Sequence, residues 1–202
     1  NVMEGCRVML QYPPDAPRDE RVRRFYDTLQ RFKSRTLVER IRDPRGENAA
    51  PTGDALTHAI TLEQLQGDVL RPGELLLDLF VGPQQTYLFA VSSDSCRMVS
   101  LPGGRSRLAR QVFLYADLVS APDRTTRDAY PPARMTSLQQ ALGLSLLGPV
   151  ADLIDAARHV LVAPDGFYSS IPFGTLMLDD GRMLMERVDV VEVPSASVLE
   201  WA

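Results

Sequence analysis

The sequence has 202 residues, the length of one large domain or two small ones. Its 45% hydrophobic and 24% charged residues are typical of a globular protein with a core, which excludes a disordered chain. A formal charge of −4 excludes a globally basic nucleic-acid binder. No apolar stretch is long enough to span a bilayer, so we expect no membrane span.

The first long segment predicts one helix over residues 18–42. Val22, Phe25 and Leu29 recur at spacings of three and four, which places them on one helix face. The opposite face is rich in arginine and is one candidate surface for acidic lipid or nucleic acid. Acidic residues are interleaved with these arginines, and they favour a solvated face with a packed apolar stripe. The partner of that stripe is either the rest of this chain or helices that precede Asn1.

A shorter helix and three strands follow. Thr61 and Gln64 form a weak capping box for a helix that ends near Val69. Three short runs with four-residue turns between them, at 74–81, 86–91 and 96–101, predict an antiparallel β-meander.

The helical period then returns in two segments. Residues 107–118 predict a helix, and the Pro- and Asp-containing residues 121–134 predict a loop. Residues 138–157 carry a strong helical stripe that Gly148-Pro149 interrupts, either as a kink or as a break between two helices.

The last third alternates between strands and turns. The apolar run 160–164 follows a helix, and this order is typical of a buried, parallel strand. A tight connection over 167–176 and a turn at 179–182 lead to a strand at 188–193. Pro194-Ser195 then opens a helix, with Ser195 or Ser197 as its cap. We therefore predict an α/β fold.

Two cysteines and two histidines give no recognisable catalytic or metal site. Cys6 and Cys96 lack a CxxC spacing or a disulfide framework, which favours a reducing, cytoplasmic setting. A thiol nucleophile needs a nearby His, but Cys96 lies in a meander strand and is expected to be a small core residue. His159 begins a predicted strand and is expected to be an edge or core residue, while His58 lies in a polar stretch. The ligand spacing of a zinc site is absent from the sequence.

Other chemistries fail on motif grounds. Ser169-Ser170 lack the G-x-S-x-G elbow of serine hydrolases, and Asp165 follows a strand like that of a nucleotide-binding domain without any phosphate loop. Gly103-Gly104 is expected to be a turn. Asp179-Asp180 is one candidate pair of metal ligands, but a hairpin turn explains the pair more simply.

Two blocks of sequence resemble the CHAT domain, a caspase-like and separase-related family often attached to tetratricopeptide repeats. The first block spans residues 60–101 and the second spans 146–199. The second block contains Pro164-Asp165-Gly166, Pro172-Phe173, Leu184-Met185-Glu186-Arg187 and Pro194-Ser195-Ala196-Ser197 in the family's order.

The resemblance implies a fold and a division of the chain. The fold would be a caspase-like, Rossmann-like three-layer half-domain with an antiparallel meander, preceded by a helical segment. Residues 1–59 would be the helical linker after a repeat region, and residues 60–202 the N-terminal part of a CHAT domain. The chain begins at Asn1 and stops at Ala202 just after a helix start, so we expect a fragment.

The resemblance also implies a function without assigning a site. In this family the catalytic His and Cys follow strands that lie further along the chain than the Pro-Ser-Ala-Ser segment. No catalytic, cofactor-binding or metal-binding residue of this sequence can therefore be assigned, and no cofactor is expected. The hypothesis is the non-catalytic half of a cysteine protease that cleaves protein substrates when a partner activates it. Its partners would be the catalytic half, the preceding repeats and an activator, with nucleic acid involved only indirectly.

The sequence leaves three hypotheses open. The chain is either half of a protease or an inactive interaction scaffold whose sheet and basic helix bind partners. A nucleotide-binding α/β domain that uses Asp165 is a third and weaker hypothesis.

Overall fold

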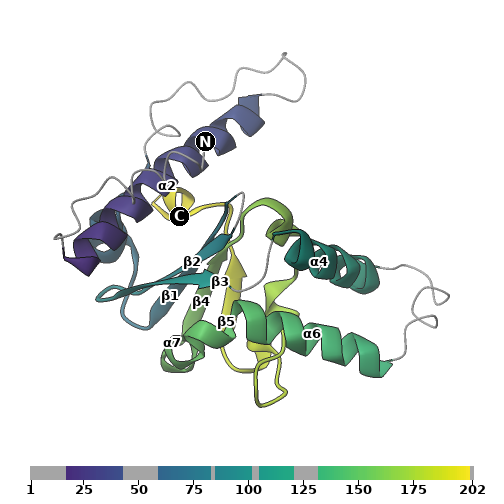
Figure 1. The fold of residues 1–202 in the computed structure, drawn as a ribbon. Helices are drawn as coiled ribbons and strands as arrows, with labels where there is room; N and C mark the ends of the chain where they lie inside the picture. The colour runs from purple at the N-terminus through teal and green to yellow at the C-terminus, as the bar shows by residue number, and fades with distance from the viewer. Residues whose placement is uncertain (1–16, 43–58, 83–84, 102–104, 121–131, 201–202) are drawn as a thin grey trace.

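The computed structural model describes residues 17–42, 59–82, 85–101, 105–120 and 132–200. These residues form one mixed five-stranded sheet with the strand order β3-β2-β1-β4-β5. Helices pack on both of its faces, with α2 on one side and α4, α6 and α7 on the other (Figure 1). The predicted α/β fold is confirmed at this level. The division of the chain at residue 59 stays a prediction.

The meander occupies one half of the sheet. Strands β1 (Glu74–Val81), β2 (Thr86–Val91) and β3 (Cys96–Leu101) pair in antiparallel order. Their bounds equal the predicted ones because Gly, Pro and Ser residues end each apolar run.

The other half of the sheet is parallel. Strand β4 (His159–Ala163) pairs with β1, and β5 (Asp189–Glu192) pairs with β4. Leu77 therefore lies between Ala90 of β2 and Val162 of β4. Strand β1 is antiparallel to β2 on one side and parallel to β4 on the other. The antiparallel and parallel parts of the sheet therefore meet at β1.

One face is covered by α4 (Arg105–Ser120), α6 (Pro132–Leu146) and α7 (Ala151–Ala156). The short 3₁₀ segment η3 (Gly148–Val150) lies between α6 and α7 and holds Pro149 in its first turn, so the predicted interruption is a break between helices. The core under these helices includes the buried residues Leu77, Val112, Leu142, Ile154 and Val162.

The other face is covered by α2 (Arg18–Arg42), α3 (Leu62–Gln64), the π-helical turn η2 (Leu65–Val69) and α8 (Ala196–Leu199). The apolar stripe of α2 packs on the sheet through Phe25, whose ring meets Tyr87 edge-on at 5.1 Å. Tyr26 meets Phe89 in the same way at 5.1 Å. The partner of the α2 stripe is thus this chain's own sheet.

The structure confirms the expected capping box of Thr61 and Gln64. The second turn of this predicted helix is π-helical rather than α-helical. Thr61 Oγ1 accepts from the Gln64 N–H at 3.2 Å, and Gln64 Oε1 accepts from the Thr61 N–H at 3.0 Å. After this turn the chain widens into the π-helical turn, where the Leu70 N–H reaches the Leu65 carbonyl at 2.9 Å.

One expected boundary needs correction, and the expected cap of α8 is confirmed in position but without a side-chain hydrogen bond. The loop predicted over 121–134 ends earlier, because α6 begins at Pro132; proline has no N–H to lose in a first helical turn. Ser195 occupies the N-cap position of α8, but its buried hydroxyl makes no hydrogen bond among the described residues. The Ser197 hydroxyl instead accepts from the Ile60 N–H at 3.2 Å.

Three short 3₁₀ turns complete the described chain: η4 (Gly166–Ser170), η5 (Phe173–Thr175) and η6 (Leu184–Glu186). Helices α4 and α6 both hold η5, because Tyr115 and Gln139 each hydrogen-bond Thr175. The following segment crosses α6 so closely that a Cβ at Gly143 would overlap the Met177 carbonyl. Only glycine fits at that crossing.

We expect Gly143→Ala to lower the free energy of unfolding by about 1–3 kcal/mol or more, because the new methyl group forces α6 away from Met177. Gly67→Ala is the matched control, since nothing lies within 4 Å of a Cβ there. We expect it to change stability by less than about 1 kcal/mol. Urea unfolding of both variants tests this, and equal stabilities would contradict the close approach.

Candidate functional site

The most unusual feature of the sheet is a carboxylate at its centre. Asp78 lies in the middle of β1, its side chain is fully buried, and it faces α2. Helix α2 brings three donors to it. Tyr26 Oη donates to Asp78 Oδ2 at 3.1 Å, and Gln30 Nε2 donates to the same oxygen at 2.5 Å. Lys33 Nζ donates to Oδ1 at 2.5 Å. The spacings of four and three place all three donors on one helix face.

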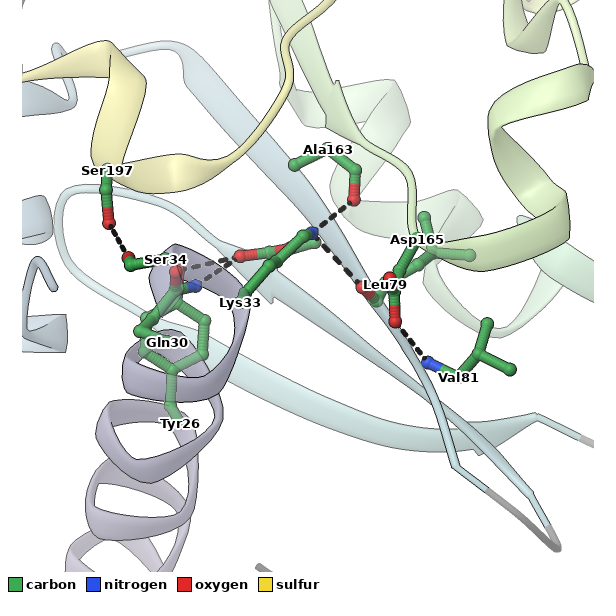
Figure 2. Close-up of polar contacts among 10 residues, drawn as sticks. Tyr26, Gln30, Lys33, Ser34, Leu79, Val81, Ala163, Asp165 and Ser197 are labelled. Atoms are coloured by element: carbon green, nitrogen blue, oxygen red, sulfur yellow. Dashed lines mark hydrogen bonds and ion pairs between the residues drawn. The ribbon is translucent and has the colours of Figure 1, made fainter. Parts of the chain in front are cut away.

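The ammonium of Lys33 also joins two neighbouring strands, β1 and β4. It donates to the Leu79 carbonyl at 3.2 Å and to the Ala163 carbonyl at 3.0 Å, as Figure 2 shows. It lies 4.9 Å from the centre of the Phe80 ring. All three ammonium protons are therefore used, at the point where β4 ends beside β1.

Asp165 fixes the loop after β4 to the same edge. Its Oδ2 accepts from the Val81 N–H at 2.8 Å. Gly166 follows with a φ of +56°, a left-handed conformation that glycine adopts without strain. A polar tie on the other side of the Lys33 group joins Ser34 of α2 to Ser197 of α8 at 3.0 Å.

The charges and hydrogen bonds of this cluster favour a structural role over acid–base catalysis. Burial, and then the charge of Asp78, raise the pKa of Tyr26 well above its ordinary value, so the phenol stays protonated as a donor. The Asp78 carboxylate accepts three hydrogen bonds, and the Lys33 ammonium makes three contacts. All three Lys33 donors are used and the Asp78 side chain is fully buried, so this pair is poorly placed to bind or deprotonate a substrate.

The Cys–His pairing considered from the sequence is not formed by the described residues. Cys96 lies on β3 and His159 on β4, with β2 and β1 between them, which separates their strands by about 14 Å. Burial raises the pKa of Cys96 to about 12, and the negative charges of Asp19, Asp27 and Asp78 add to this effect. His159 is exposed and lies 3.2 Å from Asp189. Cys6 and His58 lie outside the described residues.

The remaining candidates also lie apart from one another. Ser169 and Ser170 are exposed in η4, beyond the carboxyl end of β4, whereas His159 lies at its amino end. Gly103-Gly104 lies outside the described residues.

The Asp179-Asp180 pair lies in a turn, as its hairpin interpretation predicts. Met177 and Met183 form a β-bridge around the turn, and Gly181 has a φ of +76°. Asp180 Oδ2 lies 2.7 Å from Arg182 and 3.2 Å from Arg187. Within the described part of the chain, no three His, Cys, Asp or Glu residues gather as metal ligands would.

Sequence reasoning missed the Asp78 cluster, although two signals point to it. Asp78 interrupts the apolar run that follows Glu74, and Lys33 is the only lysine in the sequence, beside 21 arginines. An ammonium is a compact point charge that fits between two carbonyls and a carboxylate, whereas a guanidinium is a wide planar fork. The single departure from arginine therefore marks the buried position.

No protein-family model matches this chain, and a search of curated proteins finds no match. None of the helices in the described residues has the length and apolarity that crossing a membrane requires.

We expect Lys33→Met to destabilise the protein by about 3–5 kcal/mol in urea unfolding at pH 7, because Asp78 would remain as a buried charge without its counterion. The double variant Lys33→Met/Asp78→Leu removes both charges and should recover most of that loss. Arg24→Met, which breaks an exposed pair with Glu20, is the control and should change stability little. A Lys33→Met variant as stable as the wild type would contradict the structural role of the pair.

A second prediction concerns the Cys96 thiol. Because the folded-state pKa of about 12 exceeds the ordinary 9.0, raising the pH ionises the thiol in the unfolded chain first. In a Cys6→Ser variant, iodoacetamide at pH 9 should alkylate native Cys96 more than about tenfold more slowly than the same chain in denaturant. Equal rates would show an accessible, activated thiol.

Proposed function

We propose that this chain is the N-terminal, non-catalytic half of a CHAT-type, caspase-like cysteine protease, which cleaves protein substrates when a partner activates it. In this proposal the mixed sheet is the first half of a caspase-like domain. The intact protein's nucleophile would be a cysteine further along the polypeptide, activated by a histidine.

The observation that carries the proposal is the role of the side chains in the CHAT-like motifs. Asp165, from Pro-Asp-Gly, fastens the loop after β4 to the end of β1. Ser197, from Pro-Ser-Ala-Ser, ties α8 to α2 and to Ile60. These residues hold elements together, which is what a supporting half-domain requires.

Arg187, from the Leu-Met-Glu-Arg motif, also holds separate elements together. Its guanidinium is mostly buried and lies 3.1 Å from Asp155 of α7 and 3.2 Å from Asp180. It therefore joins the segment before β5 to the helical layer and to the 179–182 turn.

The shape of the sheet also supports this proposal. Strand β5 pairs only with β4 among the described residues, and its Val191 side chain is 51% exposed. A parallel edge strand of this kind can continue into the sheet of a second half-domain.

The inactive scaffold is the second candidate, and exposed apolar side chains on the helical layer favour it. Phe113 of α4 is 51% exposed and its ring lies 6.2 Å from that of Phe167, while Leu144 of α6 is 42% exposed. The exposed Phe113 ring, packed beside Phe167, is the described feature most suited to contact another protein.

The test is to read the coding sequence that follows Ala202 and to label the full-length protein. We expect one strand that ends in His and, about 40–60 residues later, a strand that ends in Cys. Substoichiometric iodoacetamide should alkylate that Cys, and its replacement by Ala should abolish both labelling and proteolysis. Cys96→Ser is the matched control and should leave both unchanged.

Either of two results would overturn the protease assignment. One is a coding sequence that ends, or continues without that His and Cys, which would leave the scaffold function. The other is loss of labelling in Cys96→Ser, which would place the nucleophile in this half.

A further inference from the structure

The antiparallel end of the sheet presents a row of backbone groups that have no partner within the part of the chain that the structure describes. The Ser92 N–H donates to the Ser95 carbonyl at 2.9 Å and closes the β2–β3 hairpin. Because hydrogen-bonded pairs alternate along an antiparallel ladder, Arg97, Val99 and Leu101 turn their backbone groups toward β2. The backbone groups of Cys96, Met98 and Ser100 therefore point outward. Among the described residues, none of these outward groups takes part in a hydrogen bond.

Strand β3 also lacks the features by which edge strands avoid association. It is six residues long, pairs with β2 without a bulge and contains no proline or lysine. Its one charge is compensated, because Arg97 forms two hydrogen bonds with Asp152 of α7 at 2.6 and 2.8 Å. Its outer edge is therefore suited to pair with another strand.

The side chains of β3 are complementary to a second copy of the same strand. In an antiparallel pair centred on Met98, Met98 lies opposite the partner's Met98, Cys96 opposite the partner's Ser100, and Arg97 opposite the partner's Val99. No like charges are opposed, and the three pairs of outward residues exchange six hydrogen bonds.

The other edge of the sheet does not suit a second copy. Strand β5 has four residues and carries Asp189 and Glu192 at its ends. Antiparallel pairing with itself would set Asp189 against the partner's Glu192, and like charges directly opposite are destabilising.

We propose that β3 is a homodimer interface: two copies of this chain pair their β3 edges in antiparallel fashion around Met98, which joins two five-stranded sheets into one of ten strands. This inference does not depend on the proteolytic assignment. The contact between two strand edges is smaller than the roughly 1,200–2,000 Å² of a standard stable interface, so we expect a weak, concentration-dependent dimer.

Crosslinking tests the register. In a background with Cys6→Ser and Cys96→Ser, Met98→Cys places two thiols opposite each other across the two-fold axis, at a Cα separation of about 5.5 Å that suits a disulfide. Val99→Cys is the matched control, because position 99 of one copy lies diagonally across from position 99 of the other and not directly opposite it. Mild oxidation should give a covalent dimer with Met98→Cys and little with Val99→Cys. Equal crosslinking of both, or of neither, would overturn the proposed pairing.

Sedimentation of the uncrosslinked protein tests the interface itself. We expect the wild type to pass from monomer to dimer as concentration rises. Met98→Pro should remain monomeric, because it removes an outward N–H that bonds nothing within the described chain. Val191→Lys on β5 should dimerise like the wild type, and circular dichroism checks that both variants fold. A wild type that stays monomeric at the highest concentration, or a dimer that Val191→Lys disrupts, would overturn the proposal.

Discussion

The buried carboxylate of Asp78 constrains everything that packs on its side of the sheet. A charge that is removed from water must be matched by donors at short range, and here one helix supplies them all. This requirement fixes α2 in both rotation and translation, since a shift of one turn would leave the carboxylate unpaired. Apolar contacts alone would tolerate such a shift far better, because they are not directional. The ion pair thus specifies one position for α2.

The same pair connects the two halves of the sheet. Lys33 binds the Leu79 carbonyl of β1 and the Ala163 carbonyl at the end of β4, and these are the strands at which the antiparallel meander meets the parallel part. Asp165 adds a second link between the same two strands at Val81. The carboxyl edge of the sheet, where α/β proteins commonly bind ligands, is occupied here by the chain's own polar groups. At this edge the described polar groups therefore hold β1 and the loop after β4 together.

Local patterns predicted the elements because each is set by residues close in sequence. The meander follows from three apolar runs with turns between them, and the break at Gly148-Pro149 follows from proline chemistry. The Asp78 cluster joins residues about 45–52 positions apart, and no local period encodes such a contact. The start of α6 at Pro132 was missed because a loop-like composition hid a residue that also suits a first helical turn. The single lysine can be read from the sequence, but the sequence does not show that Asp78 is its partner.

The contact between Lys33 and Ala163 spans 130 residues of sequence, and this separation governs the order in which the chain can assemble. During synthesis α2 leaves the ribosome long before β4 exists, while the meander can close through its own short turns. The ammonium can meet Asp78 early but reaches its full set of partners only after β4 has joined β1. Pairing of such distant segments is slow, because closing the long intervening loop costs conformational entropy before any stabilising contact forms. Helix α2, which is synthesised before the other described helices, is therefore among the last of them to be completed.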